Sequence, residues 1–301
     1  MLVWVPATWV ADVLGDMDDV DVKVVEPSDL ADPPDNVADV EFYVPSFFPK
    51  PATAAVMGQM PGLKVVQTLT AGVDKLRPHV PPGVVLCNAR GAHDASTAEW
   101  VVAAILASLR DFPSFARATS WDYHPTSALA ESTVLIVGHG SIGQATERRL
   151  AGFEVNVLRV ARQPRAGVHG LSDLPSLLGQ ADVVVLLVPF TPETAGMVDA
   201  EFLARMKDGA LLVNAARGPV VDTSALLTEL AAGRLRAAMD VTDPEPLPPG
   251  HPLWTAPGVL ITPHVAASTP VSMHRVAALV RSQVSAYLSG TPLANVITAA
   301  Y

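Results

Sequence analysis

The stretch that decides the fold is VLIVGHGSIGQATERRL, residues 134–150. An apolar run leads into three glycines at G-x-G-x-x-G spacing, and a helical pattern follows. At this spacing the first glycine permits a tight turn, the second lets the backbone approach a pyrophosphate, and the third lets helix and strand pack closely. Because N–H groups at the start of the helix point toward the same phosphates, the predicted dinucleotide site comprises Gly138, Gly140, Ser141, Ile142 and Gly143. The alternative is a glycine-rich turn without a ligand, which the flanking strand and helix disfavour. We expect His139, inside the turn, to be an exposed loop residue and not a catalyst.

Downstream of this turn, apolar runs of strand length alternate with helical segments. The runs are VNVLRV, ADVVVLLVP, ALLVNAA, RAAMDV and VLITP. Continuous apolar strands of this kind are typical of a parallel sheet that is buried on both faces. We therefore expect an α/β cofactor domain with a doubly wound parallel sheet of the Rossmann type over residues 96–271.

The first third of the chain carries shorter runs of the same character, which predict a smaller, flavodoxin-like α/β domain over residues 1–95. The pattern changes at Ser96, where a capping-box spacing to Glu99 precedes a long apolar helical run, and we place the domain boundary there. The last predicted helix, about residues 271–288, follows the completed sheet. We expect it to pack back on the first domain, which residues 272–301 then complete.

Composition limits the possible partners. Half of the 301 residues are apolar, and 20 basic against 30 acidic residues give a formal charge of -10. That charge provides no general attraction to nucleic acid or to an anionic membrane, so we expect neither as a partner. Cys87 is the single cysteine, and the N-terminal residues lack the basic segment of a signal peptide, so we expect a cytoplasmic protein without an intrachain disulfide. No histidine stands at a recognised metal-ligand spacing, and we expect no metal.

The segment VNVLRVARQPR, residues 155–165, bears on the choice of cofactor. An NAD site usually places Asp or Glu at the end of the second strand, where it accepts hydrogen bonds from the ribose 2′-hydroxyl. Here that end carries no acid and offers instead Ala161, Arg162 and Arg165. Because a guanidinium can bind a 2′-phosphate through charge-assisted hydrogen bonds, we expect NADP(H) to be preferred. The alternative is a solvated basic edge beside a site that also accepts NAD(H).

Polar side chains follow three later strands of the same predicted sheet, and ligands of open α/β sheets bind beyond the carboxyl ends of strands. We therefore expect Arg217, Asp240, Glu245 and His264 to converge. Hydride transfer to a 2-oxo acid needs a group that fixes the carboxylate, which suits Arg217, and a group that protonates the forming alkoxide, which suits His264. Glu245, between two prolines, is suited to orient that histidine and to favour its charged form.

Each of these residues also has a simpler interpretation when taken alone. Arg217 suits a surface ion pair, Glu245 a solvated loop, and His264 a helix cap or a core position. Their shared place after strands of one nucleotide-binding sheet favours the active-site interpretation.

With these residues identified, the sequence resembles the D-isomer-specific 2-hydroxyacid dehydrogenase family over nearly its whole length. The motifs that carry the resemblance are LTAGVDKL, GHGSIG, PFTPETAGMVD, NAARGPVVD, MDVTDPEPLPPGHPLW and ITPHVAAST. The resemblance implies a catalytic set of Arg217, Glu245 and His264, and a backbone substrate clamp at Ala71, Gly72 and Val73. It implies further cofactor contacts from Pro189, Thr194, Ala215 and Asp240. It also implies a homodimer formed through the cofactor domain.

Departures from the family pattern narrow the expected branch. Ala161 followed by Arg162 resembles the glyoxylate and hydroxypyruvate reductases of the family, whereas a formate dehydrogenase would carry Gln where Glu245 stands. Phe47 and Phe48, in the loop after the third strand, suggest an apolar wall, and ordinary core packing is equally compatible with them.

We therefore expect a reductase that uses NADPH to convert small 2-oxo acids into D-2-hydroxy acids. One alternative is an NAD-dependent D-2-hydroxyacid dehydrogenase, including the phosphoglycerate type. An alternative of another class is a nucleotide-sensing transcriptional partner.

Overall fold

The computed structural model describes residues 1–121 and 123–298, and their contacts divide the chain into two compact units. The first unit comprises Met1–His93 together with the chain from Pro270 onward, and the second comprises Asp94–Thr269. The chain passes from the first unit to the second at Asp94 and returns to the first at Pro270. Each of these positions lies two residues before the expected one, which was 96 for the first and 272 for the second. In the described residues, no helix is both long and apolar enough to span a membrane.

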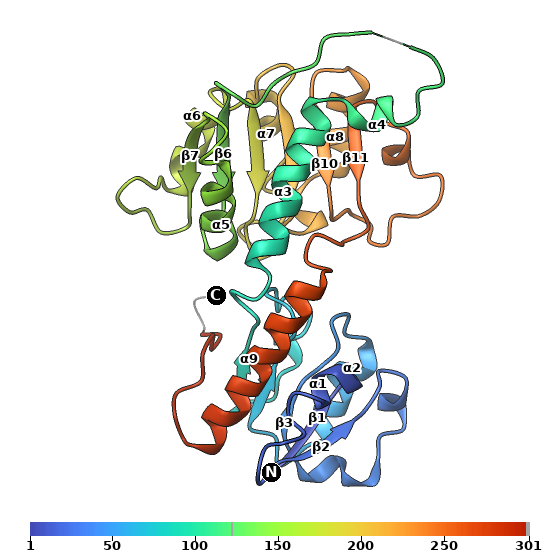
Figure 1. Ribbon diagram of the computed structural model, residues 1–301, viewed down its shortest axis with the longest axis vertical. Coiled ribbons are helices and arrows are strands. Elements are labelled where there is room, and N and C mark those ends of the chain that lie inside the picture. The colour runs from blue at the N-terminus through green and yellow to red at the C-terminus, as the bar shows by residue number, and fades with distance from the viewer. Residues whose placement is uncertain (122, 299–301) are drawn as a thin grey trace. The chain divides into compact units, whose positions relative to one another are not determined.

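The first unit is built on a parallel sheet of five short strands (Figure 1). The strands lie in the order β2-β1-β3-β4-β5, which is the flavodoxin-like order. Their bounds are β1 Leu2–Val5, β2 Asp21–Val24, β3 Val40–Tyr43, β4 Val65–Gln67 and β5 Val85–Cys87. The helices of this unit are α1 Thr8–Ala11, α2 Pro51–Ala55 and α9 Pro270–Leu288.

Helix α9 returns to the first unit, as expected for the last helix of the chain. Its valines at positions 276, 280 and 284 are fully buried and pack in one cluster with Val3, Val5 and Phe42. The four-residue spacing places these valines on one face of the helix. Buried Gln283, on the same helix, donates to the side chain of Gln67 at 2.8 Å and to the Ala294 carbonyl at 2.8 Å. Helix α9 is therefore part of the core of this unit.

The second unit contains a parallel sheet in the order β11-β10-β9-β8-β6-β7, with β7 and β6 at one side and β10 and β11 at the other (Figure 1). The strand bounds are β6 Thr133–Val137, β7 Asn156–Val160, β8 Val183–Leu186, β9 Leu211–Asn214, β10 Arg236–Met239 and β11 Val259–Ile261. The order reverses between β6 and β8, which is where open α/β sheets of this kind bind ligands.

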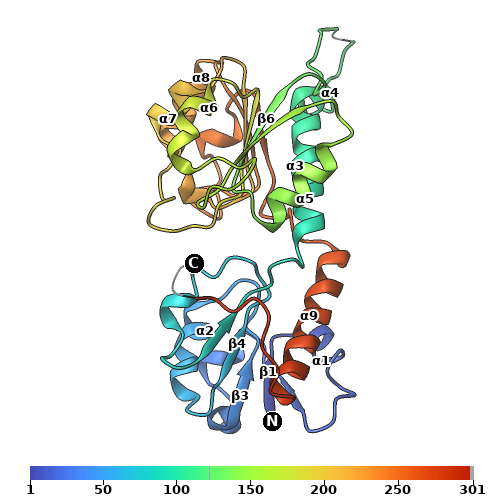
Figure 2. The same cartoon turned by 90° about the vertical axis from the view of Figure 1, so that its left-hand side faces the viewer.

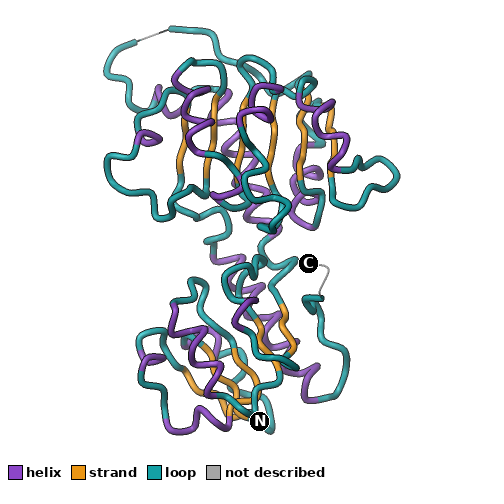
Figure 3. The backbone as a smooth tube through the Cα atoms, turned by 180° about the vertical axis from the view of Figure 1, so that it is seen from behind, coloured by secondary structure: helices purple, strands orange, loops and turns teal. Residues whose placement is uncertain are grey.

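Helices cover both faces of this sheet, so the predicted doubly wound architecture is confirmed (Figures 2 and 3). On one face lie α3 Asp94–Leu109 and α5 Ser141–Leu150, and on the other lie α6 Leu174–Leu178, α7 Ala200–Arg205 and α8 Thr223–Ala231. Strand β8 shows why these strands are apolar at every position. Val183 and Val185 pack in the core on one face of the sheet, and Val184 and Leu186 pack in the core on the other face, so both sets of side chains are buried. A further short helix, α4 Phe112–Phe115, follows α3.

The predicted capping box of the long helix is wrong. Helix α3 begins at Asp94, so Ser96 lies inside its first turn, where it is buried and its hydroxyl lies 2.6 Å from that of Thr269. Glu99 points to α5 instead, and its carboxylate accepts a hydrogen bond from Arg149 at 3.1 Å. The sequence spacing suited a cap, but tertiary contacts occupy both side chains.

Candidate active site

The glycine turn lies between β6 and α5, at the point where the strand order reverses. Gly138 has φ +109°, and a Cβ there would lie 2.5 Å from the backbone of Leu187, just after β8. A Cβ on Gly143 would lie 2.5 Å from the carbonyl oxygen of Gly138, whereas a Cβ on Gly140 would meet nothing within 4 Å. The turn therefore requires glycine for close packing at two positions and presents bare backbone to open space at the third. This arrangement fits the pyrophosphate of a dinucleotide.

Helix α5 completes this fit. It begins at Ser141 and runs for ten residues, and its N-cap is Gly140, which has no side chain with which to accept from the first N–H groups. Ser141 and Ile142 supply backbone N–H groups of this first turn. A nicotinamide dinucleotide thus has a suitable place for its phosphates at residues 138–143.

Two other predicted cofactor contacts lie in loops that follow neighbouring strands. Thr194 is 5% exposed, and its hydroxyl donates to the Pro189 carbonyl at 2.7 Å and accepts from the Thr191 amide at 2.9 Å. Ala215 directly follows β9, and its amide donates to the Leu186 carbonyl at 3.3 Å. Thr194 thus orders the loop after β8, and contacts from these residues to a cofactor stay a prediction.

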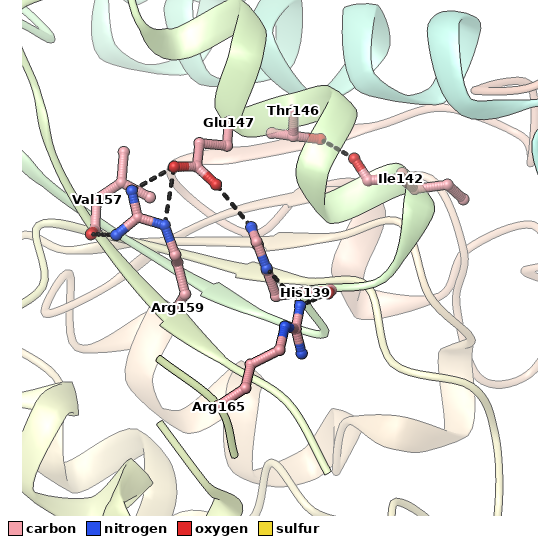
Figure 4. A network of polar contacts seen from close by, with 7 residues as sticks. All are labelled: His139, Ile142, Thr146, Glu147, Val157, Arg159 and Arg165. Atoms are coloured by element: carbon pink, nitrogen blue, oxygen red, sulfur yellow. Dashed lines mark hydrogen bonds and ion pairs between the residues drawn. The ribbon is translucent and has the colours of Figure 1, made fainter. Parts of the chain in front are cut away.

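His139, the middle residue of the G-H-G turn, was expected to be an exposed loop residue, and this expectation is wrong. Its side chain is 8% exposed, and Nε2 lies 2.6 Å from a carboxylate oxygen of Glu147 on α5 (Figure 4). Glu147 also accepts from Arg159 on β7, with Nε at 2.8 Å. The Arg159 guanidinium holds the pKa of Glu147 below its usual range, although burial opposes this effect. The turn is thereby tied to the helix and strand beside it.

Beyond β10 and β11, two predicted catalytic side chains meet. His264 Nδ1 lies 2.5 Å from Glu245 Oε1, and the side chains are 35% and 27% exposed. A carboxylate only accepts hydrogen bonds, so Nδ1 carries the proton of this contact. The ring then exchanges protons through Nε2, the arrangement that an acid–base histidine requires.

Asp240, at the end of β10, holds the His264 loop in place. Its carboxylate accepts hydrogen bonds from the Thr262 hydroxyl at 2.6 Å, the Val265 amide at 2.9 Å and the Ala266 amide at 3.0 Å. The His264 amide donates to the Asp240 carbonyl at 2.8 Å. These bonds support the left-handed backbone of His264, with φ +54°, which is uncommon outside glycine. Asp240 is 3% exposed, and the predicted contact from it to the nicotinamide end stays a prediction.

Arg217 lies in the loop after β9, and buried Asn214 shapes that loop. The Asn214 side chain donates to the Arg217 carbonyl at 3.0 Å and accepts from the Ala216 amide at 3.0 Å. The next residue, Gly218, packs so closely that a Cβ on it would lie 1.9 Å from the carbonyl oxygen of Thr242. The Arg217 loop is thus in direct contact with the loop that leads to Glu245.

The predicted substrate clamp lies after β4, in the first unit. The carbonyl oxygens of Ala71 and Gly72 accept hydrogen bonds from Asn88 at 2.7 Å and Thr70 at 2.7 Å, and the Val73 carbonyl accepts from two backbone amides. A loop whose carbonyls turn toward the protein suits the binding of a carboxylate by N–H groups. A role of this loop in substrate binding stays a prediction.

The two phenylalanines of the predicted apolar wall lie in different environments. Phe47 packs against the core cluster beneath α9 and stacks on Trp9, with ring centroids 6.1 Å apart. Phe48 is 68% exposed. Core packing therefore accounts for Phe47 but not for Phe48. Among residues 1–121 and 123–298, no group of three or more His, Cys, Asp or Glu side chains is placed to hold a metal ion.

Sequence reasoning missed three residues that shape the site: Asn214, Gly218 and Glu147. The signals were present, because Asn214 is a polar residue ending an apolar strand and Gly218 directly follows Arg217. Neither signal reveals which backbone atoms the residue meets. The partners of Glu147, on α5, come from two other elements and become visible only in the fold.

Comparison with known proteins places this geometry in a family. Residues 100–266 match the model described as D-isomer specific 2-hydroxyacid dehydrogenase, NAD binding domain. A glyoxylate reductase of Thermofilum pendens is 37% identical over 257 residues, which cover 79% of this chain and 75% of that protein. A D-3-phosphoglycerate dehydrogenase of Archaeoglobus fulgidus is 33% identical over 258 residues, or 81% of this chain. The aligned part spans only 49% of the latter protein.

A solved structure shows the same likeness over almost the whole chain. A D-isomer specific 2-hydroxyacid dehydrogenase from Xanthobacter autotrophicus Py2, in complex with NADPH and MES, superposes with a TM-score of 0.85. It is 32% identical, and the match covers 99% of this chain and 97% of that one. The likeness extends to both units, whereas the family model covers most of the second.

Proposed function

The chain belongs to the D-isomer specific 2-hydroxyacid dehydrogenase family, and from that premise we propose that it is an NADPH-preferring reductase of small 2-oxo acids. It is an oxidoreductase that transfers a hydride between a nicotinamide cofactor and a 2-oxo or 2-hydroxy acid. The proposal adds the preferred cofactor, the small size of the substrate and the residues that act. The observation that carries the proposed reaction is the His264–Glu245 contact of 2.5 Å beyond the strands of the nucleotide-binding sheet.

In the proposed reaction His264 is the general acid. The nicotinamide ring, when bound, supplies the hydride that reaches the carbonyl carbon of the substrate. Protonated His264 gives its Nε2 proton to the carbonyl oxygen, so that the forming alkoxide becomes a hydroxyl group and the imidazole becomes neutral. In the oxidative direction the neutral ring takes the hydroxyl proton back. Glu245 keeps the ring oriented throughout and stabilises its charged form.

Arg217 is the proposed binding partner of the substrate carboxylate. A guanidinium is charged at all working pH values and offers paired donors that match the two oxygens of a carboxylate. The direct packing of Gly218 on Thr242 supports this role, because it fixes the Arg217 loop against the loop that leads to Glu245. Arg217 and Glu245 are thereby carried on two loops that pack directly against each other.

The proposed NADP(H) preference rests on the end of β7. The chain after this strand carries Ala161, Arg162 and Arg165 and no acid, so the repulsion that a carboxylate would exert on a 2′-phosphate is absent. The Xanthobacter structure contains NADPH, and that similarity supports the same choice here. The test is the initial rate of NADPH and NADH oxidation with glyoxylate, hydroxypyruvate and a bulkier apolar 2-oxo acid. A preference for NADPH of about tenfold corresponds to about 1.4 kcal/mol, and equal rates would contradict the proposal.

A His264→Ala variant tests the acid–base role. We expect kcat/KM to fall about 10²- to 10⁴-fold, the range for loss of a general acid. The dissociation constant of NADPH, measured by fluorescence titration, should stay within about twofold of that of the unchanged protein. His274→Ala, at an exposed histidine of α9, is the matched control and should retain full activity. A His264→Ala enzyme with near-normal turnover would show that another group donates the proton.

A further inference from the structure

The glycine turn is backed by a chain of four side chains, His139, Glu147, Arg159 and Arg165, which come from different elements (Figure 4). Glu147 on α5 accepts from Arg159 Nε at 2.8 Å and lies 2.6 Å from His139 Nε2. On the other side of the ring, Nη2 of Arg165 lies 3.0 Å from His139 Nδ1 and 2.9 Å from the His139 carbonyl oxygen. The imidazole thus links a carboxylate on the helix to a guanidinium beside the turn.

The chemistry of the two neighbours fixes the tautomer of His139. A guanidinium has only donors, so Nδ1 must accept the hydrogen bond from Arg165 and cannot carry a proton. The remaining proton is then on Nε2, where the carboxylate of Glu147 accepts it. His139 is therefore neutral in this arrangement. Glu147 holds the ring in the one tautomer that can anchor Arg165.

The backbone of Arg165 is also fixed. Its amide donates to the Val168 carbonyl at 3.1 Å, and the Val168 amide donates back at 2.8 Å. The next residue, His169, pairs with the end of β7 through its amide to the Arg159 carbonyl at 2.8 Å, and its carbonyl accepts from Ala161 at 3.0 Å. The amides of Gly138 and His139 donate to the Val160 carbonyl at 2.9 and 3.0 Å. Arg165 is thereby carried on a small hairpin joined to the same strand end as the glycine turn.

From this geometry we propose that Arg165 is the residue that distinguishes NADPH from NADH, and that His139 and Glu147 are its positioning residues. The inference rests on the proposed preference for NADP(H). Among the described residues, the hydrogen bonds of the Arg165 guanidinium to protein come from Nη2, so the Nε and Nη1 donors are available to a ligand. A dianionic 2′-phosphate group beside the end of β7 is the ligand that such a fixed cation suits.

Arg162 is less suited to this task, although it stands closer to the strand. Glu193, in the loop after β8, has a pKa below its usual range, mainly because the Thr191 hydroxyl hydrogen bonds to it and in smaller part because the charge of Arg162 is near. Arg162 is therefore close enough to a carboxylate to act on its charge. A phosphate placed there would meet the negative charge of Glu193 as well as the positive charge of Arg162.

The first test is direct binding, without turnover. Dissociation constants of NADPH and NADH are measured by fluorescence titration for the unchanged protein and for matched Arg165→Ala and Arg162→Ala variants. We expect Arg165→Ala to weaken NADPH by about tenfold or more, as for loss of a charge-assisted hydrogen bond, and to leave NADH within about twofold. Arg162→Ala should change the NADPH-to-NADH ratio by less than Arg165→Ala does.

The positioning residues are tested by rescue and by a spectroscopic signature. His139→Asn keeps an acceptor near the place of Nδ1 and should retain NADPH affinity, whereas His139→Ala should weaken it about threefold. In Glu147→Gln the single amide oxygen accepts from Arg159, so the NH2 group faces His139 Nε2. Because an NH2 group only donates, Nε2 must then accept, and the ring proton moves to Nδ1. Nitrogen-15 NMR of the imidazole in the cofactor-free protein should show Nε2–H in the unchanged protein and Nδ1–H in Glu147→Gln. A merely structural role of Glu147 would not exchange the two signals.

The outcomes separate this inference from the proposed function. If the unchanged protein binds NADPH and NADH equally, the proposed preference fails and the inference fails with it. If NADPH is preferred but Arg162→Ala removes the preference and Arg165→Ala does not, the proposed function stands and the inference is overturned. An Nδ1–H signal in the unchanged protein overturns the positioning role of His139.

Discussion

Gly218→Ala is the change that most directly tests how the active-site loops are held together. The added Cβ would lie 1.9 Å from the Thr242 carbonyl oxygen, 2.2 Å from its carbonyl carbon and 2.8 Å from the Asp243 amide nitrogen. All three are backbone atoms, so no side-chain rotation can relieve the overlap. Ordinary contact begins at 3.4 Å, and the two loops must therefore separate by about 1.5 Å.

That separation has a calculable consequence for catalysis. Gly218 directly follows Arg217, and Thr242 lies three residues before Glu245, the partner of His264. Displacement of catalytic groups by about 1 Å can lower a rate about 10²-fold, so we expect kcat/KM of Gly218→Ala to fall by about that factor. Overpacking also costs stability, about 1 to 3 kcal/mol. The pyrophosphate turn is remote in sequence and formed by other strands, so cofactor affinity should change little.

The assay combines steady-state kinetics, NADPH titration and urea unfolding. Gly152→Ala is the matched control, because it makes the same chemical change in the same unit at a glycine with nothing within 4 Å of the added Cβ. It should leave kcat/KM unchanged. A Gly218→Ala enzyme with both normal kcat/KM and normal stability would show that the loops do not meet as described, and the contiguous placement of Arg217 and Glu245 would have to be abandoned.

Two further predictions follow from the same contacts. Glu245→Gln keeps a hydrogen-bond acceptor beside His264 but removes the negative charge that favours the protonated ring. We therefore expect kcat/KM for reduction to fall by about tenfold or more and KM for NADPH to stay unchanged. Kinetics equal to those of the unchanged protein would show that the charge of Glu245 has no role. Burial raises the pKa of the Cys87 thiol to about 11, so at pH 8 the group is a buried, protonated thiol that iodoacetamide should label only after unfolding in urea, and equal labelling of native and unfolded protein would contradict this.

The fold and the meeting of His264 with Glu245 were predictable because both follow from one periodic pattern. Every expected strand forms, since continuous apolar runs such as ADVVVLLVP can be buried on both faces only in a covered parallel sheet. In a parallel sheet the carboxyl ends of all strands lie at the same end of the sheet. His264 and Glu245 could therefore be brought together from their position after strands, without knowledge of any loop.

The errors have a different physical origin. The capping box at Ser96 and the exposed placement of His139 were both inferred from local sequence, and in each case tertiary partners decide the outcome. Ser96 meets Thr269, which is 173 residues away, and His139 meets Glu147 and Arg165 from separate elements. Local propensity cannot anticipate such partners, because they depend on how three elements pack.

His139 also shows why a phosphate-binding turn carries more information than its glycines. The glycines satisfy sterics and the helix supplies N–H groups, and both requirements are the same for NAD and NADP. Discrimination needs a charge at the ribose end, and a surface arginine alone loses much of its effect through side-chain freedom and solvent screening. An imidazole within the turn, held in one tautomer by a carboxylate, reduces that freedom for Arg165. In the proposed site, the residue between the first two glycines therefore contributes to the choice between NADP and NAD, although the G-x-G-x-x-G pattern accepts any residue at that position.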